Sequence, residues 1–462
     1  MTESGLIAGG DLDAAFATRA GQTISRRRFL ADAVALAERL PNAGAMLNLS
    51  NDRYRFAVGL AAALLRGQTS LLPPNHVPDT VARLRARFAG AYALVDSGGD
   101  GHGLPTVTHA AGDGAIAGGD VIPQIDPDLV AAYVLTSGST GDPVPHAKPW
   151  GLLVTNARSE ARRLGEALGR ADLAGVSLVA TVPPQHMYGF ESSVLIALHG
   201  GAVLDAGRPF FPADIAAALA RVPAPRVLVT TPFHLKAVLD AGLALPPLAL
   251  VLCATAPLAP QLAAEAEARL HAPLVEIYGC TEAGQVATRQ TTVGPDWHTF
   301  DTLHLEGDRD CTIVGGGHVP QPTRLADVLE VLDAQHFRLL GRSNDLVNIA
   351  GKRSSIGHLN YHLNAIGGVV DGAFWMPPER AGDPEVVRLV AFVVAPQLSE
   401  GAILAALRQR IDAAFLPRRI VQVPSLPRDP TGKQPTERLA ALAAASGTLP
   451  PAAAASHSRA TR

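Results

Sequence analysis

Short apolar runs and longer amphipathic stretches alternate along the middle of the chain. Three runs, 176–184, 225–232 and 248–257, are rich in valine, leucine and threonine and are bounded by proline. Alanine- and leucine-rich stretches with helical spacing lie between them, at 212–222 and 260–272. Strands interleaved with helices favour parallel sheets covered by helices. The pattern therefore predicts α/β layering.

The first 130 residues show the same alternation. A helical pattern over 54–67 ends at a glycine, a typical residue just beyond a helix, and 69–76 is predicted to be a short buried strand stopped by prolines. An amphipathic helix is expected after residue 25. The side chains expected on its buried face are Phe29, Leu30, Val34, Leu36 and Leu40.

The pattern changes near residue 300. Short strands over 301–341 predict a small antiparallel or barrel-like part, and a smaller α+β unit with a helix over 400–415 follows. The end of the chain is rich in alanine, serine and proline, a composition typical of disorder. We therefore expect a large N-terminal domain over 1–341, a small mobile C-terminal domain over 342–440 and a disordered tail over 441–462.

Composition excludes several classes of protein. The chain has 462 residues, of which 47% are hydrophobic, enough for two or three domains with large cores. A net charge of −3 with scattered basic residues argues against a nucleic-acid binder. Cys253, Cys280 and Cys311 are far apart, so neither a zinc ribbon nor a disulfide framework is expected. No apolar run reaches the length of a membrane span.

The stretch "SRRRFL" at 25–30 is similar to a twin-arginine export signal. Asp32, Glu38 and Arg39 interrupt the apolar segment that such a signal requires, and no cleavage site follows. An amphipathic helix is the better interpretation, and we expect the protein to be cytoplasmic.

A strand pattern over 131–135 runs into six small residues, "TSGSTG". Backbone N–H groups with little side-chain bulk can surround phosphate oxygens closely. The stretch lacks the GK[ST] of a Walker A loop and the glycine spacing of a dinucleotide-binding loop. On its own it is compatible with a phosphate loop or with an ordinary loop. Its residues are Thr136, Ser137, Gly138, Ser139, Thr140 and Gly141.

Five stretches together resemble the motifs of the adenylate-forming, or AMP-binding, superfamily of acyl- and aryl-CoA synthetases, adenylation domains and luciferases. They occur in the family's order and at compatible spacings. They are "TSGSTGDP" (136–143), "PPQHMYG" (183–189), "YGCTEAG" (278–284), "LLGRSNDLVNIAGKR" (339–353) and "LPRDPTGKQ" (426–434).

The resemblance implies two half-reactions. A carboxylate attacks the α-phosphate of ATP with Mg²⁺, and an acyl-adenylate and pyrophosphate result; a thiol then displaces AMP to form a thioester. No serine-centred carrier motif is visible, so coenzyme A or a phosphopantetheinyl acyl carrier protein is expected in trans. The style of the sequence is similar to that of compact synthetases of aryl-polyene and xanthomonadin pigment clusters, which implies an aromatic or medium acyl acid. An adenylating enzyme with a non-thiol acceptor, forming an amide or a β-lactone, and a catalytically silent scaffold remain alternatives.

The resemblance also implies roles for catalytic residues. Lys433 corresponds to the mobile lysine that neutralises charge during adenylation, and Thr281 to a contact of the α-phosphate. Glu282 corresponds to the magnesium ligand, since a hard cation prefers carboxylate oxygen. His186 and Tyr188 are expected along the passage between the acyl pocket and the thiol.

The phosphate loop is expected to hold the β- and γ-phosphates, and Tyr278 to stack on adenine. The ribose is expected to contact Asp327 and Arg342. The remaining nucleotide-binding positions implied by the motifs are Thr255, Ala256 and Gly279.

The sequence departs from the family pattern at several positions. Val144 replaces the lysine that usually follows the phosphate loop, and Lys148 and His146 are the candidates to supply this charge instead. Thr255 stands where relatives often carry glycine, which implies a narrower adenine or acyl pocket. Asn344 occupies the hinge position.

Three other features are interpreted as structural. His358 and His362 can share a helix face, but no third metal ligand is apparent. The "HGG" at 199–201 lacks an accompanying nucleophile elbow. Cys280 lies at a position that varies in the family.

Overall fold

The computed structural model describes residues 4–42, 44–73, 75–109, 121–137, 143–300, 302–308, 311–342, 346–349, 352–377, 389–427 and 436–446. The chain divides into two compact units. The first comprises Met1–Leu258, Leu262–Leu325 and Glu330–Arg338. The second comprises Ala259–Gln261, Ala326–Leu329 and Leu339–Arg462.

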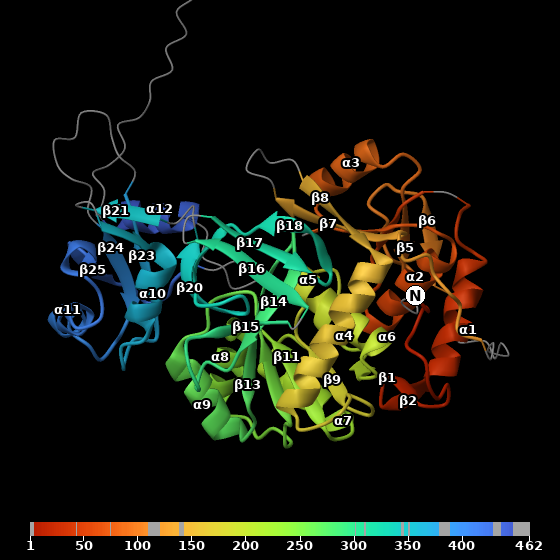
Figure 1. Cartoon of the computed structure of the whole chain (residues 1–462), viewed down its shortest axis with the longest axis horizontal. Helices are drawn as coiled ribbons and strands as arrows, with labels where there is room; N and C mark the ends of the chain where they lie inside the picture. The colour runs from red at the N-terminus through yellow and green to blue at the C-terminus, as the bar shows by residue number, and fades with distance from the viewer. Residues whose placement is uncertain are drawn as a thin grey trace, which may run out of the picture. The chain divides into compact units, whose positions relative to one another are not determined.

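A six-stranded sheet lies in the N-terminal part of the first unit (Figure 1). Five of its strands are parallel, and the last strand turns back antiparallel to its neighbour. In spatial order the strands are β6 (Thr106–Thr108), β5 (Tyr92–Val95), β3 (Met46–Asn48), β4 (Ser70–Leu72), β7 (Val130–Ser137) and β8 (Pro143–Pro149).

An eleven-stranded sheet contains a parallel centre with antiparallel strands at both edges. In spatial order its strands are β19 (Asp327–Val331), β20 (His336–Arg342), β15 (Trp297–Thr299), β14 (Gly284–Arg289), β13 (Leu274–Cys280), β12 (Leu250–Cys253), β11 (Arg226–Thr230), β9 (Ser177–Ala180), β10 (Val203–Asp205), β1 (Ala15–Arg19) and β2 (Gln22–Ser25).

Helices cover both faces of the parallel centre, because successive side chains of each strand point to opposite faces. On β11, Val227 and Val229 pack in the cluster that includes Leu164 of α4, whereas Leu228 packs with Leu235 of α8. The expected α/β layering is confirmed. The helices of this unit are α1 (Arg26–Ala37), α2 (Arg53–Leu65), α3 (Pro78–Arg87), α4 (Trp150–Ala167), α5 (Met187–Gly189), η1 (Phe190–Leu195, a π-helix), α6 (Ile196–His199), α7 (Pro212–Arg221), α8 (Pro232–Ala241) and α9 (Pro260–Leu270).

Helix α1 follows the expected pattern with one exception. Phe29, Leu30 and Leu36 are buried, as is Leu40 beyond the helix, but Val34 is 42% exposed. Its predicted burial is therefore wrong. Ala33 and Ala37 occupy the buried face instead, because small residues allow this helix to pack closely.

The strands after residue 300 separate into two groups. Strands β16 (Leu303–Asp308), β17 (Cys311–Gly316) and β18 (Val319–Arg324) form an antiparallel sheet, as expected. Strand β18 contains two prolines, which an edge strand tolerates because it needs fewer ladder donors. Strand β20 instead extends the large sheet by pairing with β15, and its Phe337 is fully buried.

The second unit has its own core. A three-stranded sheet of β23 (Asp371–Trp375), β24 (Val390–Val394) and β25 (Arg419–Gln422) packs with its helices, and β21 (Leu346–Ile349) pairs with β22 (Lys352–Ser355). The expected helix over 400–415 ends early, and the Asp412 side chain accepts a hydrogen bond from the Ala414 N–H at the start of a separate 3-10 turn. The helical segments are α10 (Ile356–Asn364), α11 (Glu400–Arg408), η3 (Ala413–Phe415) and α12 (Thr436–Ala445).

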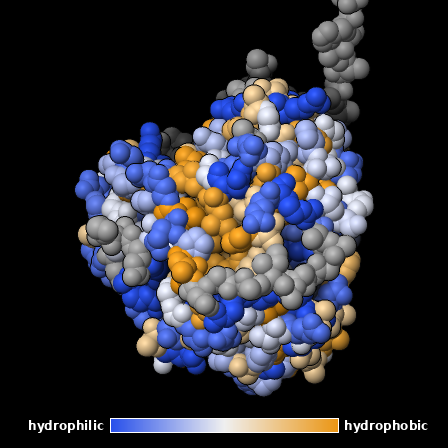
Figure 2. All heavy atoms as spheres, turned by 90° about the vertical axis from the view of Figure 1, so that its right-hand side faces the viewer, coloured by the Kyte–Doolittle hydropathy of each residue, from blue (hydrophilic) through white to orange (hydrophobic). Residues whose placement is uncertain are grey.

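On the face that carries the N-terminal elements, Figure 2 shows hydrophobic residues gathered in a central area surrounded by polar ones. Exposed hydrophobic side chains of the N-terminal part include Val34 and Val121. Among the described residues, none of the helices combines the length and hydrophobicity required to cross a membrane.

Candidate active site

The "YGCTEAG" stretch forms the end of β13, a tight turn and the start of β14. Cys280 and Gly284 are paired across the two antiparallel strands. Gly284 has a φ of +81°, and a Cβ there would lie 2.9 Å from Oε1 of Glu191. A Cβ on Gly279 would lie 2.5 Å from the carbonyl oxygen of Gly284. Both glycines therefore allow a turn that larger residues would distort.

The turn presents two predicted functional residues. Thr281 is half-buried and Glu282 is exposed. No group of three or more His, Cys, Asp or Glu residues that could hold a metal ion occurs in the described part of the chain. One carboxylate still fits magnesium, which keeps several waters and is often completed by phosphate oxygens. The site therefore suits a metal–nucleotide better than a protein-enclosed metal.

Lys148 lies directly behind this turn. Its Nζ donates to the carbonyl oxygens of Thr281 at 2.5 Å and Glu282 at 3.2 Å. Lys148 comes from β8 of the six-stranded sheet, so the contact joins both sheets at the candidate site. Although the sequence raised Lys148 as a substitute for the missing loop lysine, its amine is bound to the backbone of a different motif.

Two buried carboxyl groups lie in the same region. Glu191 accepts a hydrogen bond from the Asn156 amide at 2.5 Å; burial raises its pKa, and the nearby Lys148 ammonium opposes this rise. Glu160, on α4, is fully buried, and neither of its side-chain oxygens has a hydrogen-bond partner among the described residues. Burial raises the pKa of Glu160 to about 7 because a low-dielectric interior disfavours the charged form.

Replacement of Glu160 by glutamine is expected to change how stability depends on pH. Between about pH 4.5 and 7 the folded wild type retains a proton on Glu160 that the unfolded chain has lost. The free energy of unfolding should therefore fall as pH rises, by at most about 1.4 kcal/mol per pH unit. Denaturant titrations of Glu160→Gln should show a flatter profile, whereas the exposed Glu166→Gln on the same helix should retain the wild-type slope.

Tyr278 lies among aromatic side chains at the end of β13. Its ring centroid is 5.8 Å from that of Trp297 and 5.4 Å from that of Phe337. Arg289 lies over the Trp297 ring at 4.4 Å. This packing places the Tyr278 ring in a fixed position three residues before Thr281.

Thr255 has an unusual backbone conformation just after β12, the strand beside β13. Its φ is +83°, which is strained for a β-branched residue. The buried Oγ1 atom of Thr255 has no hydrogen-bond partner in the described structure. Ala256 follows and is half-buried. Because the carboxyl ends of parallel neighbours meet at one edge, this segment and the 278–284 turn lie at the same edge of the sheet.

His186 and Tyr188 follow β9 at this edge. His186 is half-buried and directly precedes α5. Tyr188 is buried and donates its hydroxyl to the carbonyl of Leu252 at 2.8 Å. Tyr188 therefore helps to fix the segment that carries His186.

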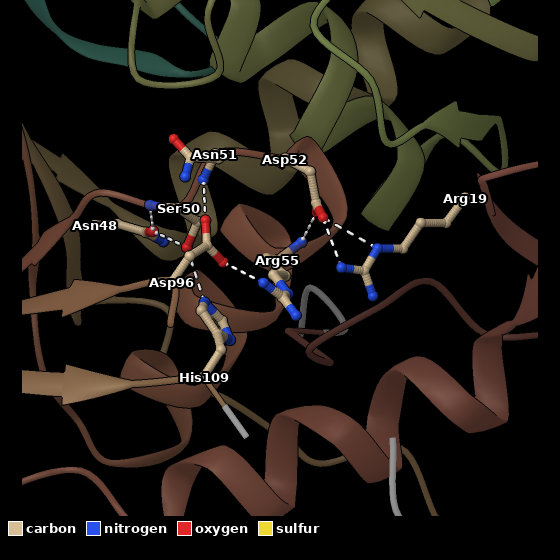
Figure 3. A network of polar contacts seen from close by, with 8 residues as sticks. All are labelled: Arg19, Asn48, Ser50, Asn51, Asp52, Arg55, Asp96 and His109. Atoms are coloured by element: carbon tan, nitrogen blue, oxygen red, sulfur yellow. Dashed lines mark hydrogen bonds and ion pairs between the residues drawn. The ribbon is translucent and has the colours of Figure 1, made fainter. Parts of the chain in front are cut away.

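A cavity of about 280 Å³ lies where strands of both sheets end. Gln185, next to His186, is among its lining residues, with Asn48, Ser50 and Asp96. Figure 3 shows the network that holds this wall: Asp96 accepts from the Asn51 N–H and from Arg55, and Ser50 contacts His109 at 2.8 Å.

Ser50 and His109 do not form an activated nucleophile pair. Ser50 donates its hydroxyl proton to Oδ1 of Asn48 at 2.7 Å (Figure 3). The neutral His109 ring, whose pKa burial lowers to about 4, must then donate to Ser50. The network therefore has a structural role in this wall.

Other predicted site residues end a strand of the six-stranded sheet, belong to the second unit or are not described. Thr136 and Ser137 end β7, whereas 138–141 and Lys433 lie outside the described residues. Asp327 begins β19 and Arg342 ends β20; both belong to the second unit. Sequence reasoning missed Asn156, Glu160 and Glu191, although acidic residues in otherwise apolar helical stretches were an available signal.

The chain is similar in sequence to known proteins. A sequence profile described as AMP-binding enzyme matches residues 92–309. The chain is 31% identical over 288 residues to the 4-coumarate–CoA ligase of Rhodobacter capsulatus, covering 62% of this chain and 69% of that protein.

Solved structures share the fold. ATP-bound MatB from Rhodopseudomonas palustris superposes with a TM-score of 0.74 at 18% identity, covering 94% of this chain and 97% of that one. The amide bond synthetase McbA from Marinactinospora thermotolerans superposes with a TM-score of 0.75 at 18% identity, covering 95% and 97%. The predicted fold class is confirmed.

Proposed function

Because the chain belongs to the family of AMP-binding enzymes, we propose that it activates a carboxylic acid with ATP and transfers the acyl group to a thiol. The observation that carries this proposal is the turn with Thr281 and the exposed Glu282, at the same sheet edge as Thr255 and Ala256. The fixed Tyr278 ring lies beside this turn.

The first half-reaction brings together two anions, a carboxylate and the α-phosphate of ATP. In this proposal Glu282 holds Mg²⁺, which when bound supplies positive charge beside the phosphates. Thr281 donates its hydroxyl to the α-phosphate, and Tyr278, Gly279, Thr255 and Ala256 surround the adenine.

Residues outside this turn complete the proposed site. Residues 136–141 enclose the β- and γ-phosphates, Asp327 and Arg342 contact the ribose, and Lys433 enters for adenylation. In the second half-reaction the thiolate attacks the acyl carbonyl, AMP leaves, and His186 lines the path of the thiol.

Coenzyme A and an acyl carrier protein are both proposed acceptors. The relative in Rhodobacter capsulatus is named as a CoA ligase for 4-coumarate, which favours coenzyme A and an aromatic acid for this chain. The resemblance of the sequence to pigment-cluster synthetases favours a carrier protein. An amine acceptor is a second candidate, because the structural neighbour McbA is an amide bond synthetase.

The test is pyrophosphate release with a panel of aromatic and medium-chain acids, followed by product analysis with coenzyme A, a phosphopantetheinyl carrier protein or an amine. Acid-dependent pyrophosphate release with a thioester product is the expected result. An amide product would replace the thiol part of the proposal, and no release with any acid would contradict the proposed activity.

Replacement of Thr255 by glycine is expected to widen the range of carboxylic acids that the enzyme accepts as substrates. Glycine adopts the φ of +83° without strain and removes a side chain from the sheet edge. The ratio of kcat/KM for bulky over small acids should rise by roughly 10-fold, the effect of one or two methylenes in a pocket. Thr255→Ala removes bulk but keeps the strained backbone. An unchanged ratio in both variants would remove Thr255 from the acyl pocket.

A further inference from the structure

We propose that Lys148 is a positioning residue that holds the Thr281–Glu282 backbone so that the Glu282 carboxylate faces the metal–nucleotide. The inference rests on the proposed function for the identity of the bound group. Its structural basis is the pair of hydrogen bonds from Nζ to two consecutive carbonyl oxygens.

Burial makes this arrangement unusual for a lysine. Lys148 is 8% exposed, and a buried ammonium group is costly unless it is hydrogen-bonded and paired. The two carbonyl groups lie in the turn between β13 and β14, beyond the Cys280–Gly284 pair. The ammonium therefore replaces hydrogen bonds that the strand ladder does not supply there.

Two further buried side chains, Glu191 and Asn156, support Lys148. Glu191 is the acidic group that acts most strongly on its charge, and Asn156 holds the Glu191 carboxyl group. The Glu191 carboxyl group also lies close to the turn, since a Cβ on Gly284 would be 2.9 Å from its Oε1 atom. Side chains from β8, α4 and η1 thus act on one turn of five residues.

The hydrogen-bond partners of the Lys148 amine distinguish a positioning role from direct binding of phosphate. Its amine is bound to the main chain of Thr281 and Glu282, whereas the Glu282 side chain is exposed. Loss of Lys148 should therefore affect the geometry of the magnesium ligand. Misplacement by about 1 Å can reduce a rate by roughly 10²-fold.

The test compares Lys148→Met and Glu191→Gln with wild type and with Lys236→Met. Lys236 is a suitable control because it is a half-buried lysine of α8 whose ammonium group pairs with Asp240. Calorimetry measures ATP affinity with magnesium and with EDTA, without any acid. Stopped assays measure adenylation and, separately, thioester formation from a supplied acyl-adenylate.

We expect Lys148→Met to weaken magnesium–ATP binding about 10-fold or more, following the effect of lost supporting groups on metal affinity, and to change ATP binding in EDTA less. Adenylation should fall on the order of 10²-fold, while thioester formation and the control stay near wild type. Glu191→Gln should show a smaller loss in the same direction, and it keeps the test available if Lys148→Met does not fold.

Equal losses with and without magnesium, or equal losses in both half-reactions, would overturn the positioning role. Wild-type magnesium–ATP binding in Lys148→Met would also overturn it. If wild type binds magnesium–ATP but activates no acid, the proposed function fails, while the calorimetric comparison still decides the role of Lys148.

Discussion

Replacement of Lys433 by alanine is expected to reduce adenylation by about 10²–10³-fold, the usual cost of losing one preorganised electrostatic group. Lys433 lies in "TGKQ", and in the proposed mechanism it enters the site only for the first half-reaction. Thioester formation from a supplied acyl-adenylate should stay nearly unchanged, because no charge then develops at phosphorus.

The two half-reactions must be assayed separately, with an acid identified by the pyrophosphate panel. Lys236→Ala is the control, since this half-buried lysine of α8 pairs with Asp240 of the same helix. Equal losses in both half-reactions would contradict movement of Lys433 between two states. Full activity in both would remove it from catalysis.

Replacement of Glu282 by glutamine is expected to raise the magnesium concentration needed for half-maximal adenylation by about 10–100-fold or more, since even supporting groups of a metal site have effects of that size. Glutamine keeps the shape of the side chain but removes the negative charge that a hard cation prefers. Because Glu282 is exposed, thermal unfolding should change little.

A magnesium titration of pyrophosphate exchange measures this effect. Glu306→Gln on β16 changes a carboxylate that is also exposed and serves as the control. The loss in Glu282→Gln should be partly recovered at high magnesium. A titration curve that coincides with the wild-type curve would exclude Glu282 as the metal ligand.

The chain's local patterns were sufficient to predict its α/β layers. The continuous apolar run of β11 favoured a strand of a parallel sheet covered by helices, and the structure has helices on both faces of it. The "YGCTEAG" stretch was also readable, because Gly279 and Gly284 are required by a turn whose shape depends on nearby residues. Such features depend on short-range geometry, so they can be recognised from a few consecutive residues.

The local sequence patterns did not predict which strands and helices pack against one another. Val34 has the spacing of a buried residue but is exposed, because the neighbouring element packs against Ala33 and Ala37. Strand β20 pairs with β15 of the large sheet, and its Phe337 is stacked on Trp297. Periodicity specifies which residues share a face, whereas packing across long sequence separations decides which face is covered.

The sequence by itself determined the order of the motifs. That order indicated the family, and the family motif identified Glu282 and Thr281 as candidate site residues. Only the tertiary structure decided what Lys148 does, because its two acceptors lie 133 and 134 residues away along the chain. The same is true of Thr255, whose strained φ cannot be inferred from a threonine in isolation. Hydrogen bonds and strain of this kind arise when distant segments are packed together, and the free energy of the whole core maintains them.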